Sequence, residues 1–311
     1  MRILLAGALP PPSVAAALVS PLQTAAPTLA GWLALSRTQS QAVDTAASLC
    51  TPWEAWLLQE CGFAPRPGQA LSAGLGPLLD PESGHAGPMW LLELAHFSPS
   101  RDGAVLIPAR QLAITQEQSV ALFASARRSF EESGFEIRPC STTHLTVQLP
   151  DGVQPACPSP ELVSQANLND WWPQDAALRP WRRLFNEVQM LWFDHPVNEM
   201  RAGQGQPPLN ALWLFGGATR AQLQHLPAEV LRDTHIEHAL ADAVNAQDWG
   251  GWLAEMGRLE HTLFAAQRAA RPEIIFTGAD RILTSEPGRR WWHRLRRNTP
   301  DTWSTAWSNP A

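Results

Sequence analysis

The residue pattern of one central segment constrains the fold of this chain most, because it predicts a complete small folding unit of strands and a helix. Residues from Trp90 to Gly152 alternate between strand-like and helix-like patterns, separated by turn residues. Thr115 and Gln118 match a capping box at the start of the helix, and Gly134 is suited to end it. The expected order is two strands, a helix and two strands, at residues 90–96, 104–107, 115–133, 136–138 and 143–149. The sequence therefore predicts a compact α+β unit in the middle of the chain.

The composition excludes several classes of function. The chain has 311 residues, of which 45% are hydrophobic and 17% charged, so it can bury a sizeable core. All 23 basic residues are Arg, so no lysine can serve a P-loop, a Schiff base or a kinase site. A net charge of −6 with dispersed arginines argues against a nucleic-acid partner. The bias toward Ala, Arg, Pro and Trp indicates a GC-rich bacterial genome.

Cysteine spacing and hydropathy indicate a cytoplasmic protein with reduced thiols. Cys50, Cys61, Cys140 and Cys157 form no CxxC pair and predict no zinc site. Pro10-Pro11-Pro12 interrupts the apolar N-terminal run too early for a secretory signal, so the run is better interpreted as a buried strand. No apolar run approaches about 18 residues, so we expect no transmembrane helix and no membrane partner.

Outside the middle unit, strand-like and helix-like patterns are shorter. They predict a strand at 2–9, helical segments at 41–61, 181–200, 233–245 and 251–268, and strands at 211–215 and 273–277. A Pro/Gly-rich passage at 65–88 indicates a boundary. Arginines and tryptophans alternate in 289–297 and predict an amphipathic helix, which either packs its Trp face or contacts a membrane surface or nucleic acid.

The densest unusual chemistry lies between Asn186 and Ala218. His195-Pro196-Val197-Asn198 is followed by Arg201, a Gly/Pro turn and the apolar segment Asn210–Gly217. In order and spacing this stretch resembles the inserted domain of the archaeal-type, cofactor-independent phosphoglycerate mutases, a branch of the alkaline-phosphatase superfamily. The middle unit follows the same domain's order of elements.

The resemblance continues at both ends but departs from the family where metals would bind. Ile3–Leu9 is similar to the family's opening strand, which ends in Asp-Gly, and Ala6 stands at the Asp position. Glu273–Arg281 is similar to the strand leading to Thr-Gly-Asp-His, without the metal-binding His. The family transfers a phosphoryl group through a serine and two divalent metals. The resemblance thus implies the fold and a ligand preference, and we expect no catalytic residue, no metal and no cofactor.

Five residues are candidates for contact with a phosphorylated small acid. They are His195, Asn198, Arg201, Asn210 and Arg101. The planar guanidinium of Arg201 suits a phosphate or carboxylate, with a surface ion pair as the alternative. His195 and Asn198 could instead cap or turn the backbone, Asn210 could enter a strand, and Arg101 could belong to a hairpin turn.

Two further features have competing interpretations. Gly216-Gly217 could form a tight turn after a strand or an anion nest. His235 and His238 could face one side of a helix and share a metal, or belong to a solvated helix face. Six acidic or histidine residues could supply rearranged metal ligands: Asp233, His235, His238, His261, Asp280 and His293. Convergence of three or more of their side chains in the folded chain would favour an active enzyme.

The expected fold is α/β, with a reduced alkaline-phosphatase-like core and an inserted α+β domain. We expect residues 1–87 and 219–311 to form the core and residues 88–218 the inserted domain. Three functions remain open at this point. They are a degenerate mutase homologue that binds a phosphorylated small acid or regulates, an active mutase or phosphatase with rearranged ligands, and a structural module that binds another protein or a second copy.

Overall fold

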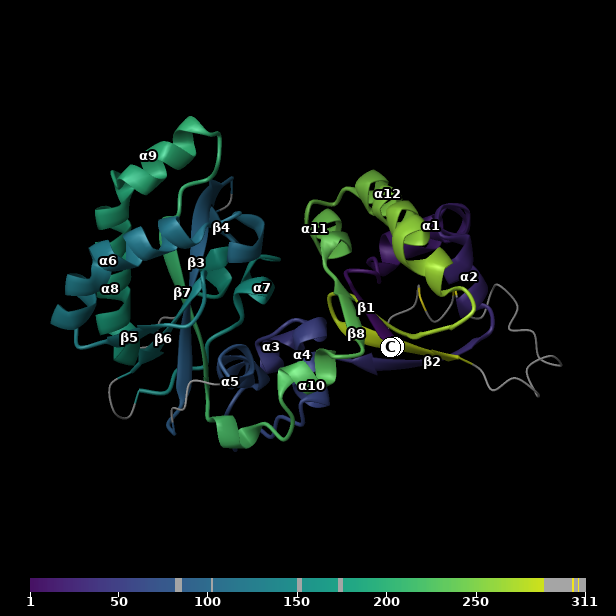
Figure 1. Cartoon of the computed structure of the whole chain (residues 1–311), viewed down its shortest axis with the longest axis horizontal. Helices are drawn as coiled ribbons and strands as arrows, with labels where there is room; N and C mark the ends of the chain where they lie inside the picture. The colour runs from purple at the N-terminus through teal and green to yellow at the C-terminus, as the bar shows by residue number, and fades with distance from the viewer. Residues whose placement is uncertain are drawn as a thin grey trace. The chain divides into compact units, whose positions relative to one another are not determined.

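In the computed structural model, the protein has a mixed α/β fold with two β-sheets (Figure 1). The sequence predicted this α/β fold class. The structure describes residues 1–81, 86–101, 103–149, 153–172, 176–287, 304 and 307. The helix expected at 289–297 lies outside the described residues. The chain divides into a first unit of Met1–Thr45, Thr51–Leu57 and Ala228–Ala311, and a second unit of Ala46–Cys50 and Leu58–Pro227.

The first unit is built on a five-stranded mixed sheet with the order β2-β10-β9-β1-β8. Its strands are β1 (Arg2–Ala6), β2 (Ser36–Ala42), β8 (Thr234–Glu237), β9 (Glu273–Thr277) and β10 (Arg281–Pro287). β1 is central and parallel to both β8 and β9, whereas β10 is antiparallel to its neighbours β9 and β2. The sequence of β1 is apolar on both faces, which is typical of a strand buried between layers.

Helices cover one face of this sheet (Figure 1). They are α1 (Pro12–Ala25), α2 (Pro27–Leu33), α11 (Ala239–Asn245) and α12 (Trp249–Leu259). One continuous hydrophobic core joins Ile3 and Leu5 of β1 to Leu22 of α1 and Met256 of α12. This packing gives the unit a layered α/β architecture.

The second unit contains a five-stranded antiparallel sheet with the path β4-β3-β6-β5 and β7 paired with β3. Its strands are β3 (Met89–Ser100), β4 (Gly103–Ile107), β5 (Glu136–Pro139), β6 (His144–Gln148) and β7 (Ala211–Ala218). All four strands predicted for the middle segment are confirmed. β7 continues through Gly216 and Gly217, so the prediction of a tight turn at these two residues is wrong.

The long helix of this unit begins and ends as its sequence predicts. In α6 (Gln116–Glu132), Thr115 Oγ1 accepts the N–H of Gln118, and the Gln118 side chain accepts the N–H of Thr115. Gly134 has a positive φ of 75° and its N–H donates to Glu131, which closes the C-terminus. α6 packs beside α8 (Arg179–Phe193) along one face of the sheet (Figure 1).

Several predicted elements differ from the structure. The helix expected at 181–200 is two helices, α8 and α9 (Pro196–Gly203), because Pro196 cannot continue α8 but is favourable in the first turn of α9. The helix expected at 41–61 is the end of β2 followed by α3 (Thr45–Ser48) and α4 (Pro52–Glu60). The helix expected at 233–245 is β8 followed by α11.

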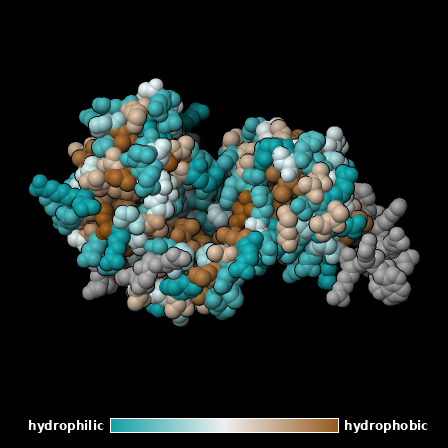
Figure 2. All heavy atoms as spheres, viewed as in Figure 1, coloured by the Kyte–Doolittle hydropathy of each residue, from teal (hydrophilic) through white to brown (hydrophobic). Residues whose placement is uncertain are grey.

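The remaining elements are short. They are α5 (Leu75–Leu79), α7 (Pro160–Val163), α10 (Pro227–Leu231), a π-helical turn at Glu260–Phe264, and 3₁₀ turns at Leu71–Gly74, Ala109–Gln111, Leu168–Asp170, Ala176–Leu178, Arg220–Gln222 and Ala265–Gln267. Among the described residues, no helix combines the length and apolar character of a membrane span. Hydrophobic residues are scattered among hydrophilic ones on the face in Figure 2.

Candidate functional site

The C-terminal ends of β1 and β9 are the place where the mutase resemblance implies metal ligands. The two strands are parallel neighbours, with Ala6 opposite Thr277. Ala6 and Thr277 are both buried, and Leu9 N–H donates to the Thr277 carbonyl at 3.2 Å. A methyl group at residue 6 supplies neither charge nor a coordinating oxygen.

Two tryptophans fill this end of the sheet. The Nε1 of Trp252 donates to the Gly7 carbonyl at 2.9 Å, and the Nε1 of Trp307 donates to the Ala8 carbonyl at 3.0 Å. Both indoles are fully buried, and their ring centroids lie 6.0 Å apart. The carbonyls that follow β1 are therefore bonded to indole N–H groups. The residues present here do not fit a pair of divalent metals.

The described residues also contain no group of three or more His, Cys, Asp or Glu side chains that could hold a metal ion. His235 lies on strand β8 and His238 precedes α11, so the predicted pair on one helix face is wrong. Asp280 pairs with Arg281 at 3.3 Å. His293 lies outside the described residues.

His195 and Asn198 hold the junction between α8 and α9. The Nδ1 of His195 accepts the N–H of Val197 at 3.2 Å and caps α9. The buried side chain of Asn198 donates to the carbonyls of Trp192 and Leu209 and accepts the Leu209 N–H at 2.7 Å. These bonds fix the chain on both sides of α9.

Arg201 lies inside the protein, not on its surface. Its side chain is fully buried, and burial lowers its pKa from the usual value. Its guanidinium donates to the Pro207 carbonyl at 2.8 Å, to Gln118 Oε1 at 2.9 Å and to the Leu112 carbonyl at 2.7 Å. Arg201 thus joins α9 to α6, and no carboxylate pairs with it among these contacts.

Asn210 and Arg101 lie elsewhere in the second unit. The Asn210 amide both donates to the carbonyl and accepts the N–H of Phe97, at 3.1 and 2.7 Å, and so aligns β7 with β3. Arg101 is exposed at the turn between β3 and β4. The structure therefore gives Asn198, Arg201 and Asn210 internal partners, and a ligand-binding role for the five residues stays a prediction.

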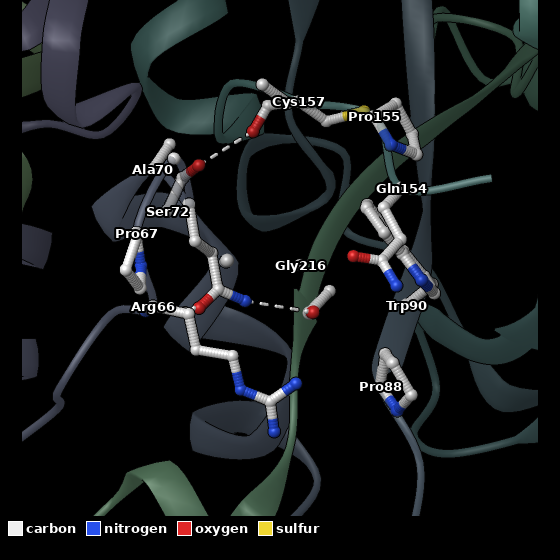
Figure 3. Close-up of a pocket in the computed structure, with 15 residues that line it drawn as sticks. Arg66, Pro67, Ala70, Ser72, Pro88, Trp90, Gln154, Pro155, Cys157 and Gly216 are labelled. Atoms are coloured by element: carbon white, nitrogen blue, oxygen red, sulfur yellow. Dashed lines mark hydrogen bonds between the residues drawn. The ribbon is translucent and has the colours of Figure 1, made fainter. Parts of the chain in front are cut away.

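A separate pocket in the second unit brings polar donors together (Figure 3). Its volume is about 190 Å³. Arg66 and Ser72 line one wall, Trp90 and Gln154 the other, and the backbone of Gly216 lies between them (Figure 3). Within the described part of the chain, the side chains of Arg66, Trp90 and Gln154 have no hydrogen-bond partner.

The loop that carries Arg66 is held in place by two glutamines. Gln69 Nε2 donates to the Gly217 carbonyl at 3.1 Å, and its Oε1 accepts the Arg66 N–H at 3.0 Å. Gln222 Nε2 donates to Gln69 Oε1 at 2.7 Å and to the Ala64 carbonyl at 3.0 Å. The loop is therefore pre-organised against the end of β7 before any ligand arrives.

The two glycines of β7 are required by this geometry. Gly216 and Gly217 have φ of +94° and +112°. A Cβ on Gly217 would lie 2.6 Å from the Trp90 ring, and one on Gly216 would lie 2.7 Å from the Met89 carbonyl oxygen. Glycine thus allows the close approach of the Trp90 ring and of the Met89 carbonyl to β7.

The sequence did not identify Arg66, Trp90 or Gln154 as site residues. Arg66 belongs to Pro65-Arg66-Pro67-Gly68, which was interpreted as a domain boundary. Gln154 comes from a loop nearly ninety positions later, so only the folded chain brings the two together. The one available signal was Gly216-Gly217, whose alternative interpretation was an anion nest.

No protein-family model and no curated protein sequence matches this chain. Among solved structures, it is similar to the cofactor-independent phosphoglycerate mutase from Thermoplasma acidophilum DSM 1728, with 15% identity over 98% of this chain and 94% of that chain and a TM-score of 0.37. It is also similar to the PH0037 protein from Pyrococcus horikoshii, with 12% identity over 98% of this chain and 91% of that chain and a TM-score of 0.52. Both similarities extend over nearly the whole chain at low sequence identity, and the second match shows a shared fold.

Proposed function

We propose that this protein binds a small phosphorylated acid in the pocket of Arg66, Trp90 and Gln154, without metal-dependent phosphoryl transfer. The observation that carries the proposal is the guanidinium of Arg66, which lines the pocket with no partner among the described residues. A guanidinium presents a planar fork of donors that matches a phosphate or a carboxylate with two parallel hydrogen bonds.

The rest of the pocket supports a small anionic ligand. The Trp90 indole N–H adds a donor on the facing wall, and the Gln154 amide can donate from the same wall. A cavity of roughly 150 Å³ holds a benzene-sized molecule. The volume of about 190 Å³ is therefore suited to a short phosphorylated acid and too small for a nucleotide. The mutase resemblance supports the same ligand class.

The tryptophans at the end of β1 support the absence of metal-dependent transfer. Phosphoryl transfer of this kind depends on divalent metals that neutralise charge on the transferred group. Trp252 and Trp307 occupy the sheet end where the resemblance implies those metals. Binding without transfer would suit a regulatory homologue of the mutases.

The test is a calorimetric titration of the protein with 3-phosphoglycerate in chelator. We expect saturable binding in the wild type and at least about a tenfold loss of affinity in Arg66→Ala. The matched control is Arg128→Ala, because Arg128 is an exposed arginine of the same unit that pairs with Glu132 on α6. Equal affinity in Arg66→Ala and wild type would refute this pocket.

Arg101→Ala is a second arm of the same experiment, because Arg101 is the exposed arginine predicted from the sequence. Loss of binding in Arg101→Ala with retention in Arg66→Ala would move the ligand to the β3–β4 turn. The same buffers with glycerate alone test whether the phosphate is needed, since the proposal requires much weaker binding of the unphosphorylated acid.

A protein-interaction module is the second candidate function. Met190 and Phe193 on α8 are each 80% exposed, which is unusual for large apolar side chains. Light scattering across a concentration series, with Met190→Ser/Phe193→Ser as the comparison, tests self-association. A concentration-independent monomer mass for the wild type would exclude a second copy as the partner.

A further inference from the structure

A serine, a histidine and a glutamate lie in hydrogen-bonding sequence at the turn between β5 and β6. Ser141 Oγ lies 3.2 Å from Nδ1 of His144, and Nε2 of His144 lies 3.1 Å from Oε2 of Glu93. Ser141 is exposed, His144 is half-buried and Glu93 is buried. Nucleophile, base and orienting carboxylate therefore follow one another from solvent toward the interior, an arrangement that recurs in metal-independent acyl transfer.

Glu93 fixes which nitrogen of His144 carries the proton. Its Oε1 accepts the N–H of Ala109 at 2.8 Å, and its Oε2 faces His144 Nε2. A carboxylate held this way accepts a hydrogen bond, so Nε2 carries the hydrogen and Nδ1 keeps its lone pair. The ring also contacts Phe215 edge-on, with centroids 5.9 Å apart, which holds its orientation.

The hydroxyl of Ser141 is activated from two sides. Its Oγ accepts the backbone N–H groups of Thr143 at 3.3 Å and of His144 at 3.2 Å. Two N–H donors stabilise developing negative charge on that oxygen, while Nδ1 can accept its proton. Thr143 Oγ1 also approaches Nδ1, at 2.9 Å, but Thr143 is half-buried whereas Ser141 faces solvent.

Ser141 lines a groove in the second unit. The groove has a volume of about 710 Å³ and runs between α6 and β5, with apolar side chains that include Val120, Phe123 and Leu145 along its length. Thr142 Oγ1 donates to Gln116 Oε1, at the first residue of α6, at 2.7 Å. The turn that carries Ser141 is therefore tied to the N-terminus of this 17-residue helix.

We propose that Ser141, His144 and Glu93 form a second, metal-independent site that hydrolyses carboxylic esters with an apolar acyl chain. Ser141 Oγ bonds to the acyl carbon while its proton passes to His144 Nδ1. The ester C–O bond then breaks, and the alcohol leaves with that proton. Water attacks the acyl-serine, gives one proton to Nδ1 and releases the acid, and Nδ1 returns the proton to Ser141. The apolar chain lies in the groove, and Glu93 acts as a positioning residue.

This site is independent of the Arg66 pocket, because the residues that line the groove and the pocket do not overlap. The experiment is labelling of the intact protein with a fluorophosphonate probe, which reacts with activated serines, followed by peptide mass mapping. We expect one adduct, on Ser141, formed in the presence of chelator. Ser141→Ala should reduce labelling to background, and His144→Gln should slow it by about 100-fold.

Matched variants distinguish loss of the reactive groups from a general disturbance of the fold. Ser100→Ala removes another exposed serine of the same unit and should label at the wild-type rate. Thr143→Val removes the competing hydroxyl and should still label. Glu93→Gln should slow labelling at least about tenfold and alter its pH profile. Absence of labelling in the wild type, an adduct on another residue, or unchanged rates in a folded His144→Gln would each overturn the proposal.

Discussion

The indole Nε1 of Trp307 donates a 3.0 Å hydrogen bond to the backbone carbonyl of Ala8, at the end of the central strand β1. The carbonyl of Trp307 in turn accepts a 2.9 Å bond from Nη2 of the buried Arg281. A residue close to the end of the chain therefore completes the core of the first unit. It does so at the sheet end where the sequence resemblance implies metal ligands.

Trp307→Ala should lower the free energy of unfolding by about 3–5 kcal/mol, because it empties a fully buried indole site. Trp307→Phe keeps most of the apolar volume but leaves the Ala8 carbonyl without a hydrogen-bond donor. The unpaired carbonyl should lower the free energy of unfolding by about 1 kcal/mol, in addition to any loss from imperfect packing. Urea denaturation measures both. Arg128→Ala, at an exposed position on α6, is the control and should change stability by no more than about 0.5 kcal/mol.

Ala6→Asp should not restore a metal site. Ala6 is fully buried, so the new carboxylate would lose its hydration, at a loss of at least about 3 kcal/mol. Thermal melts with and without manganese measure the effect. A large stabilisation of Ala6→Asp by manganese, absent from the wild type, would show that the sheet end can still hold metal.

Arg201 should behave as a structural residue. Replacing it with Met leaves Gln118 Oε1 and the Leu112 and Pro207 carbonyls without their donor, so we expect a loss of at least about 3 kcal/mol. Arg201→Lys can satisfy one of these acceptors and should lose less. Urea denaturation orders the two variants, and wild-type stability in Arg201→Met would contradict the assignment.

The stability of the second unit should fall in mild acid because of His96. Burial lowers the pKa of His96 below its usual value, and hydrogen bonds with Pro208 and Asn210 offset this only in part. The unfolded chain keeps the ordinary histidine pKa near 6.5 and therefore binds more protons below that pH. This contribution to stability is complete above about pH 6.5 and is lost progressively as pH falls toward the folded pKa.

The measurement is urea denaturation of wild type and His96→Gln between pH 7.5 and 5. Because glutamine does not titrate, the wild type should lose more stability than the variant over the lower half of that range. Parallel pH dependence of the two proteins would show that His96 is protonated equally in the folded and unfolded chains.

Local sequence signals predicted the elements whose determinants lie close together in the chain. Thr115 and Gln118 are three residues apart, so the start of α6 could be identified from that pair alone. β9 has the bounds predicted for it, because Glu273–Thr277 is a short apolar run between loop residues.

Elements fixed by distant partners were missed. β2 is polar along most of its length and is an edge strand, so its pairing with β10, not its own pattern, makes it a strand. β8 falls in the segment 233–245 that the sequence predicts as helical, whereas its pairing with β1 makes it a strand. The pocket of Arg66, Trp90 and Gln154 was missed for the same reason, because its walls come from segments far apart in sequence.

The proposed function requires that the pocket of Arg66, Trp90 and Gln154 binds a phosphorylated small acid without metal. Calorimetric titration of 3-phosphoglycerate into the wild type, first in chelator and then in manganese, tests it most directly. We expect the same dissociation constant in both buffers, and no appearance of 2-phosphoglycerate in the recovered sample by phosphorus NMR. Binding that needs manganese, or conversion of the ligand in its presence, would contradict it.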